Sequence, residues 1–176
     1  ALQSLAHNQL VEIHRNRGAF VAKPTPQEAR EVFEARELLE PRTARSAAQR
    51  ATAHDIAFLK AHIAKEHEAL ANDDRGLALY LSGQLHLHIA HIAAQATIAN
   101  FIEALIARSS LIVALYWKRE SALCERFAHH SLVQALENND EKAAEELMRS
   151  HLVDPQSAMD LHRAPTIGAS LKEILE

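Results

Sequence analysis

The stretch HHSLVQALENNDEKAAEELMRSHL, residues 129–152, predicts two amphipathic helices joined by a tight turn. His129 shares a helix face with the apolar residues that follow it, and His151 with those that precede it. Each histidine lies eleven residues from Asp140, about 16 Å along a helix. If the chain reverses at this turn, two inward imidazoles come level across an antiparallel hairpin. Their apolar neighbours are Leu132, Val133 and Leu136 on the first helix and Ala144, Leu147 and Met148 on the second.

A third histidine, His86, also lies on an apolar helix face, which it shares with Ile89 and Ala90. Three imidazoles facing one point suit Zn²⁺, Ni²⁺ or a similar ion, with water or a carboxylate in the remaining positions. The alternative is that each histidine is a core residue hydrogen-bonded to a neighbour, the more common role of a single inward histidine. Glu125, one turn before His129, is a candidate outer group.

The composition favours one helical domain. The 176 residues are 48% apolar and 24% charged, with only 4 glycines and 5 prolines. The formal net charge of −4 gives no support for a nucleic-acid surface over the whole chain. Cys124 has no partner for an internal disulfide. Since we find no secretory signal, and no apolar run near the roughly 20 residues of a membrane span, we expect a cytoplasmic protein without a membrane partner.

Helical periodicity predicts an all-α fold, an antiparallel bundle of six to seven helices preceded by a short β-hairpin. ANDDRG (71–76) and ENND (137–140) are turns whose Asn and Asp side chains can cap the next helix. Asp154 is expected to cap a further short helix that begins at Pro155. The predicted helices cover residues 26–51, 54–72, 74–96, 98–117, 119–138 and 140–153, with a last piece from about 155.

The N-terminal part differs from the rest of the chain. Segments 10–14 and 19–22 alternate like strands and flank a basic turn that runs from Arg15 to Gly18. They predict a small hairpin.

A linker and a strong helix start follow the hairpin. Thr25 is the predicted cap, Pro26 takes the first helical position, and Glu28 completes a capping box. Because the sequence begins in the middle of a pattern, without an initiator Met, we expect a fragment. Residues 1–24 then end an upstream domain, and residues 25–176 form the helical domain.

Several stretches together resemble GntR-type transcription regulators of the FadR subfamily, with their helical C-terminal ligand-binding (FCD) domain. NQLVEIHRNRGAFVAKPT (8–25) looks like the end of a winged helix-turn-helix, with Gln9 where the family usually has Gly. EVFEARELLEPRTARSAAQRA (31–51) is similar to the first helix of the ligand domain. LHLHIAHIAAQ (85–95) resembles the family's Phe-His-x-x-Ile-Ala segment, and residues 129–152 resemble its last two core helices.

The resemblance implies a divalent metal held by one Asp and three His, in a pocket where small carboxylates bind as effectors. It assigns the three ligands to His86, His129 and His151, and it selects His129 over His130. The family's Asp is Ser82 here, so the site should be weaker, or rely on water or on the effector's carboxylate. The loss of one negative charge should also favour an anionic effector.

The same resemblance implies effector contacts from Arg36, Ser82 and Gln95. Arg36 could face the effector's carboxylate. Alternatively, it forms only a structural pair with Glu40, four residues later on the same helix.

The resemblance also implies homodimers that bind palindromic operator DNA. Arg15, Arg17 and Gly18 of the hairpin are then the DNA-contacting residues, and the two arginines suit phosphate or minor-groove contact. The alternative is that they are ordinary solvated turn residues.

A metal-dependent enzyme in a helical bundle is the competing hypothesis, with open metal positions for a substrate. No histidine has a Glu three residues before it, as di-iron carboxylate bundles require. No nucleophile arrangement or phosphate-binding loop is evident either, so we expect a protein that is not an enzyme. Six other histidines are expected at the surface, namely His7, His14, His54, His62, His67 and His162.

Overall fold

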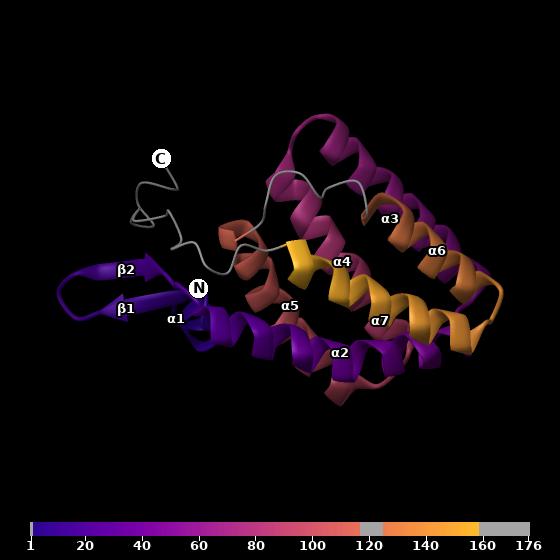
Figure 1. Cartoon of the computed structure of the whole chain (residues 1–176), viewed down its shortest axis with the longest axis horizontal. Helices are drawn as coiled ribbons and strands as arrows, with labels where there is room; N and C mark the ends of the chain where they lie inside the picture. Colours follow the sequence, from indigo (N-terminus) through magenta and orange to yellow (C-terminus); the bar gives the residue numbers. More distant parts are fainter. Residues whose placement is uncertain (1, 117–124, 159–176) are drawn as a thin grey trace.

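The computed structural model describes residues 2–116 and 125–158, which form seven helices and one two-stranded antiparallel sheet (Figure 1). This confirms the predicted all-α bundle with a short hairpin at its N-terminal side. The elements are α1 (Leu2–His7), β1 (Val11–His14), β2 (Gly18–Val21), α2 (Pro26–Ala48), α3 (Ala53–Ala71), α4 (Arg75–Ile92), α5 (Ala96–Tyr116), α6 (Glu125–Glu137) and α7 (Glu141–Ala158).

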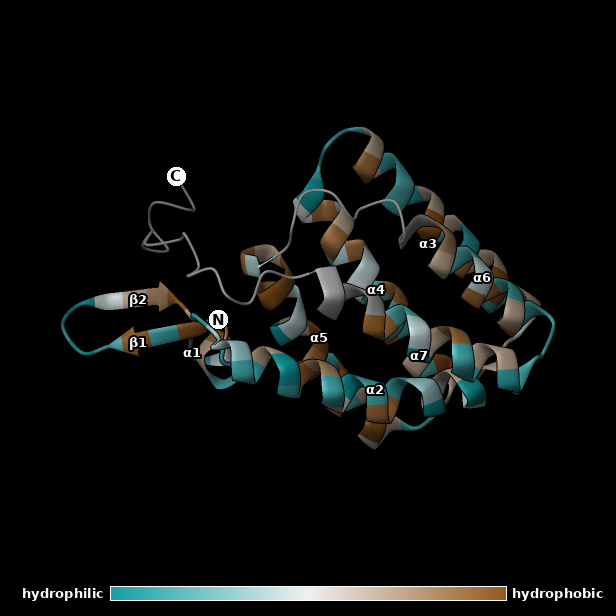
Figure 2. Ribbon diagram, viewed as in Figure 1, coloured by the Kyte–Doolittle hydropathy of each residue, from teal (hydrophilic) through white to brown (hydrophobic). Residues whose placement is uncertain are grey.

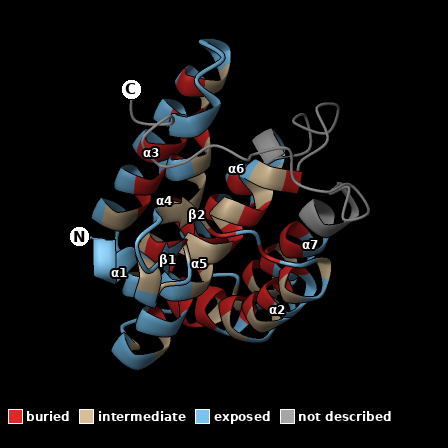
Figure 3. Ribbon diagram, turned by 90° about the vertical axis from the view of Figure 1, so that its left-hand side faces the viewer, coloured by how far each residue is buried: buried red, intermediate tan, exposed pale blue. Residues whose placement is uncertain are grey.

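Helix α2 runs along one side of the bundle and packs against α4, α5, α6 and α7, while α3 packs against α4 and α6 (Figure 1). Each helix carries both hydrophobic and hydrophilic residues (Figure 2), and the buried residues lie on the sides of the helices that face one another (Figure 3). The largest buried cluster lies among α2, α3, α4, α6 and α7. Its bulkiest members are Leu59, Ile63, Leu85, Ile89, Leu132, Leu136, Met148 and Leu152.

The predicted helix starts are present. Thr25 accepts a hydrogen bond from the amide of Glu28, whose side chain accepts one from the amide of Thr25, which completes the capping box. Asp74 caps α4, and Asp140 accepts from the amide of Ala143 at the start of α7.

The C-terminal part of the bundle departs from the prediction at one helix boundary. Pro155 was expected to begin a new helix behind Asp154, but α7 continues through it to Ala158, so that prediction is wrong. A proline removes one hydrogen bond from a helix, and the packing of α7 against α2 and α6 outweighs this loss; α2 likewise continues through Pro41. Residues 119–124 of the helix predicted over 119–138, and the last piece from residue 159 on, lie outside the described residues.

The expectation that no apolar segment approaches the length of a membrane span is wrong for α5. It has 21 residues and a mean hydropathy of 1.7 in its most apolar window, so length and composition alone would allow it to cross a membrane. In the bundle it packs against α2 and α4 and buries Ile102, Ile106 and Ile112. Only 28% of that window is buried in the bundle, so much of this apolar helix faces outward.

The hairpin pairs Val11 with Val21 and His14 with Gly18. Gly18 has a φ of 95°, with no atom near its missing side chain, so backbone conformation alone explains the glycine. Gln9 has a φ of 58°, a conformation that glycine adopts more readily. This fits the observation that the resembled family usually has Gly there.

At Gly83, α4 lies close to α5. A Cβ added to it would lie 2.8 Å from Cγ2 of Ile106, whereas one added to Gly76 would come no closer than 3.9 Å to a side-chain oxygen. We expect Gly83→Ala to lower the free energy of unfolding by about 1–3 kcal/mol through overpacking. Gly76→Ala should leave it unchanged or raise it by up to about 1 kcal/mol. Urea unfolding of both variants checks this, and equal effects would contradict the close approach.

Candidate metal centre

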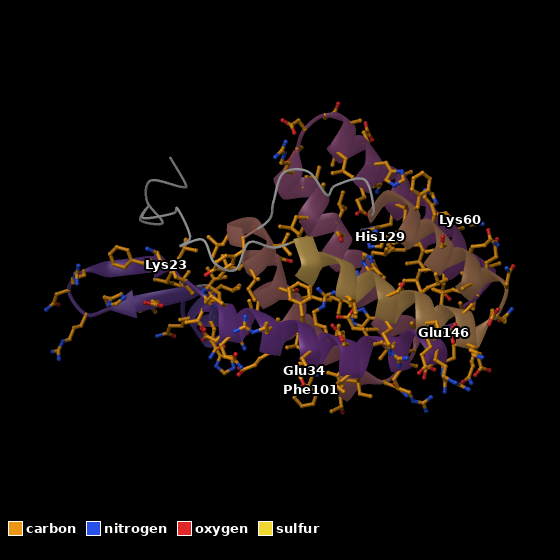
Figure 4. The ribbon with its side chains drawn as sticks, viewed as in Figure 1. Lys23, Glu34, Lys60, Phe101, His129 and Glu146 are labelled. Carbon is orange, nitrogen blue, oxygen red and sulfur yellow. The ribbon has the colours of Figure 1, made fainter. Side chains whose placement is uncertain are left out.

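Three histidines from three helices meet in the interior of the bundle. Nε2 of His151 on α7 lies 3.1 Å from Nε2 of His86 on α4 and 3.1 Å from Nε2 of His129 on α6. The three residues are 5%, 3% and 1% exposed, respectively, and His129 is seen inside the bundle in Figure 4. Together they form a group that could hold a metal ion. The predicted convergence of these side chains is therefore confirmed.

The α6–α7 turn produces this register. Asn139 adopts a left-handed φ of 53°, which closes the turn, and Asp140 then caps α7. Because His129 and His151 are equally far from Asp140, the two helices return them to the same level. Leu132, Leu136 and Met148 are buried on the same faces, which fixes the rotation of both helices.

Two buried carboxylates orient the imidazoles from behind. Nδ1 of His86 donates to Glu40 of α2 at 2.6 Å, and Nδ1 of His129 donates to Glu66 of α3 at 2.9 Å. Such partners fix the tautomer and leave Nε2 free as a ligand atom. Sequence reasoning missed Glu66 entirely and treated Glu40 only as a partner of Arg36. The available signal was position, since Glu66 shares a helix face with the buried Leu59 and Ile63.

Electrostatics keep two of the imidazoles neutral and Glu40 charged. Burial lowers the pKa of His151 well below its ordinary value, and the nearby His129 and His86 lower it further. Burial also lowers the pKa of His86, although Glu40 opposes this. Burial works against ionisation of Glu40, but Arg36 and His86 prevail and lower the pKa of its carboxyl to about 2. Neutral imidazoles are the form that binds metals.

The donor arrangement fits a cation. His86 and His129 donate through Nδ1, which leaves Nε2 of each ring as the atom that faces Nε2 of His151. A neutral His151 has one N–H, which cannot make a full hydrogen bond to both. A positive ion among the three nitrogens would satisfy all of them. Two nitrogens bound to one Zn²⁺ at 2.0–2.1 Å in tetrahedral geometry lie about 3.3 Å apart, close to the 3.1 Å observed.

Arg36 belongs to the same polar network. Its guanidinium pairs with both carboxylate oxygens of Glu40 and donates through Nη1 to the hydroxyl of Ser109 on α5 at 2.9 Å. Arg36 is buried, and Glu40 links it to His86. The structural pair within α2 is therefore present. Because Glu40 also contacts His86, only one side chain separates the buried guanidinium of Arg36 from a candidate metal ligand.

The remaining candidate effector residues lie at two different places. Ser82 is half-buried, one helical turn before His86 on α4. Gln95 lies in the α4–α5 turn, nine residues after His86 and beyond the C-terminal end of α4. Its Oε1 is buried and has no hydrogen-bond partner in the described part of the chain. Within the described residues no carboxylate joins the three-histidine group, so the position of the family's Asp stays without an acid.

One histidine expected at the surface is buried. His62 is 8% exposed, and its Nε2 donates to the carbonyl oxygen of Leu81 at 2.8 Å. The packing of α3 on α4 covers it, with the ring of His88 5.3 Å away between centroids. His67 is half-buried beside His130, while His162 and the side chain of Glu125 lie outside the described residues.

Comparison with known proteins gives one family and a set of related folds. The model of the FCD domain family matches residues 31–154, well over half of the chain. No curated protein matches this sequence closely enough to count as a relative. Several solved structures also match this chain in fold.

GntR of Streptococcus agalactiae has a TM-score of 0.67 at 20% identity, covering 89% of this chain and 78% of its own. McbR/YncC of E. coli has 0.73 at 18%, covering 89% and 81%. A GntR transcriptional regulator from Rhodococcus sp. RHA1 has 0.75 at 19%, covering 88% and 74%. At these identities the likeness establishes the fold. The family and these neighbours belong to transcription regulators, not to enzymes, so the enzyme hypothesis is not kept.

Proposed function

This chain belongs to the FCD domain family of GntR-type transcription regulators, and we propose that its bundle senses a small carboxylate through a metal held by three histidines. The observation that carries the proposal is the convergence of three buried Nε2 atoms, two of them on rings oriented by carboxylates. Histidines on a solvated surface would not be buried, and buried carboxylates would not fix their tautomers.

His86, His129 and His151 would hold the ion, and Glu40 and Glu66 would keep two of the rings in place. Three imidazole nitrogen ligands suit Zn²⁺ or Ni²⁺. When bound, the ion supplies a Lewis acid with open positions that a carboxylate oxygen can enter. Ser82 stands where the resembled family has an Asp that binds the metal. We therefore expect weaker metal binding than in proteins with that Asp, and a larger contribution of the effector's carboxylate to holding the ion.

The charges around the site favour an anion. Arg36 carries one positive charge, and Glu40 and Glu66 carry one negative charge each, so a divalent ion leaves the group with a net positive charge. An Asp at position 82 would cancel it. The proposed effector contacts are Arg36, Ser82 and Gln95; Arg36 has the strongest support, because it is buried and joined to a metal ligand through Glu40.

The hairpin supports the DNA-binding part of the proposal. Arg15 and Arg17 are exposed at its tip, beside Gly18, where a wing would reach phosphates. Residues 1–24 would then end a winged helix domain, in a cytoplasmic homodimer that binds a palindromic operator. Placement in the FadR subfamily rests on the resemblance of the sequence.

Thermal unfolding tests the proposed sensing function. Zn²⁺ or Ni²⁺ at roughly a hundred times its Kd should stabilise the chain by about 2.7 kcal/mol, or about 5–10 °C in Tm for a domain of this size. Among small carboxylates, the effector should add a further rise only in the metal-loaded chain. His91→Ala, at an exposed position of α4, should behave like the wild type. A wild-type Tm unmoved by either metal would contradict the proposal.

A further inference from the structure

Residues 22–25 join the hairpin to the bundle, and Tyr116 at the C-terminal end of α5 contacts this linker. The hydroxyl of Tyr116 donates to the carbonyl oxygen of Pro24 at 2.5 Å. Both residues are buried. Figure 1 shows the hairpin projecting beyond the N-terminal end of α2, so the orientation of this linker sets where the hairpin points.

The other hydrogen bonds of the linker among the described residues join it only to its neighbours in sequence. The amide of Ala22 donates to the carbonyl of Leu10, within the hairpin, and Thr25 and Glu28 cap α2. Among the described residues, the hydrogen bond from Tyr116 is the one that ties the linker to a helix other than α2. Tyr116 is therefore placed to control the linker from a distant part of the chain.

The Tyr116 side chain is itself firmly held. Its ring belongs to a buried cluster with Phe33 and Val32 of α2 and Ile112 of α5. Burial raises the pKa of the Tyr116 hydroxyl, and Glu28 adds to this, so the group stays protonated and able to donate. A movement of α5 along α2 would therefore carry the hydroxyl with it.

The same face of α5 contacts the candidate metal centre. Ser109 lies seven residues before Tyr116, which is two helical turns, about 10 Å, and nearly the same rotation. Its hydroxyl accepts a hydrogen bond from Arg36, which is paired with Glu40, the partner of His86. One helix thus carries a contact to the site at Ser109 and a contact to the linker at Tyr116.

We propose that Tyr116 is the positioning residue through which the bundle sets the orientation of the hairpin, with α5 as the connecting element from Arg36 and Ser109. The first half, that Tyr116 holds the hairpin, stands on the contacts described above. The second half, that occupancy of the metal centre changes this hold, rests on the proposed function. Occupancy of the centre that moves His86 would carry Glu40 and Arg36 with it and alter the contact of Arg36 with Ser109. The resulting shift of α5 relative to α2 would move Pro24.

The test measures distances between two spin labels by pulsed electron resonance. The labels are attached to the full chain through Arg15→Cys on the hairpin and Lys142→Cys on α7, both at exposed positions, with Cys124→Ser as background. Tyr116→Phe removes only the hydroxyl. Tyr80→Phe, at an exposed tyrosine of α4, is the matched control.

Without metal, Tyr116→Phe should broaden the label distance distribution, and Tyr80→Phe should not. A net hydrogen bond contributes about 0.5–1.5 kcal/mol, so the population with a displaced hairpin should rise roughly two- to tenfold. A distribution for Tyr116→Phe as narrow as that of the wild type would overturn the first half, whatever the metal centre does.

With Zn²⁺ at saturation, the wild-type distance should shift. Ser109→Ala should still bind Zn²⁺ but lose the shift, while keeping the narrow distribution of the wild type without metal. Zn²⁺ binding without any shift in the wild type would overturn the second half. Absence of Zn²⁺ binding in the wild type would instead overturn the proposed function and the second half together, and leave the first half to be decided by Tyr116→Phe.

Discussion

Replacing His151 with alanine should remove most of the affinity of the chain for Zn²⁺ or Ni²⁺. Its Nε2 is the atom within 3.1 Å of both other imidazoles, so its loss leaves two nitrogens with no third ligand from α7. We expect affinity to fall by more than the roughly 10–100-fold that follows loss of an outer partner of a ligand. Competition with a chromophoric chelator measures this.

Two variants accompany this measurement. His130→Ala changes an exposed neighbour of the ligand His129 and should retain wild-type affinity, as should His91→Ala. His151→Ala should still fold, because the surrounding apolar cluster holds the bundle together. Circular dichroism checks that its helices are intact. If His151→Ala, folded, bound metal as tightly as these two controls, the three-histidine assignment would be wrong.

Replacing Glu66 with alanine should weaken metal binding by about 10–100-fold, although Glu66 is not expected to touch the ion. Its carboxylate accepts from Nδ1 of His129, and without it that buried N–H loses its partner and the ring its orientation. Glu66→Gln should have a smaller effect, because an amide oxygen can still accept the hydrogen bond.

The same competition assay provides the test, with Glu68→Ala, at an exposed position of α3, as the control. Equal affinities for Glu66→Ala and Glu68→Ala would show that the orienting role of Glu66 is unnecessary. An order of affinities running from wild type through Glu66→Gln to Glu66→Ala would support it.

The parts of the site that follow local rules could be predicted from sequence. Equal distance from one turn pairs His129 with His151, and helix phase places His86 on the inner side of α4. Both steps need only the rise and rotation of an α-helix and a correctly located turn. The resemblance then selected His129 over His130, and the burial of His129 agrees with that choice.

The parts that depend on packing between distant helices could not be predicted in the same way. Glu66 and His62 lie on α3, and their partners, His129 on α6 and the Leu81 carbonyl on α4, are settled only when α3 packs against both helices. A carboxylate and a histidine on the stripe with Ile63 were the available signal. Reading Pro155 as a helix start failed for a related reason, since packing outweighed a local preference.

A chain of hydrogen bonds and ring contacts passes through every helix from α2 to α7. It runs from Ser109 through Arg36 and Glu40 to His86, and then through His151 and His129 to Glu66. Buried polar groups are costly unless all are satisfied. The two short Nε2–Nε2 contacts are the one part of this chain that neutral side chains cannot fully satisfy, and a cation there would complete it.

Anomalous diffraction at the zinc absorption edge, from crystals of the chain grown with Zn²⁺, tests the central claim most directly. We predict a single strong peak among the three histidines, about 2.0–2.1 Å from Nε2 of His86, His129 and His151. A peak elsewhere on the chain, or density for the three imidazoles with no anomalous signal between them, would contradict the assignment of this site as a metal centre.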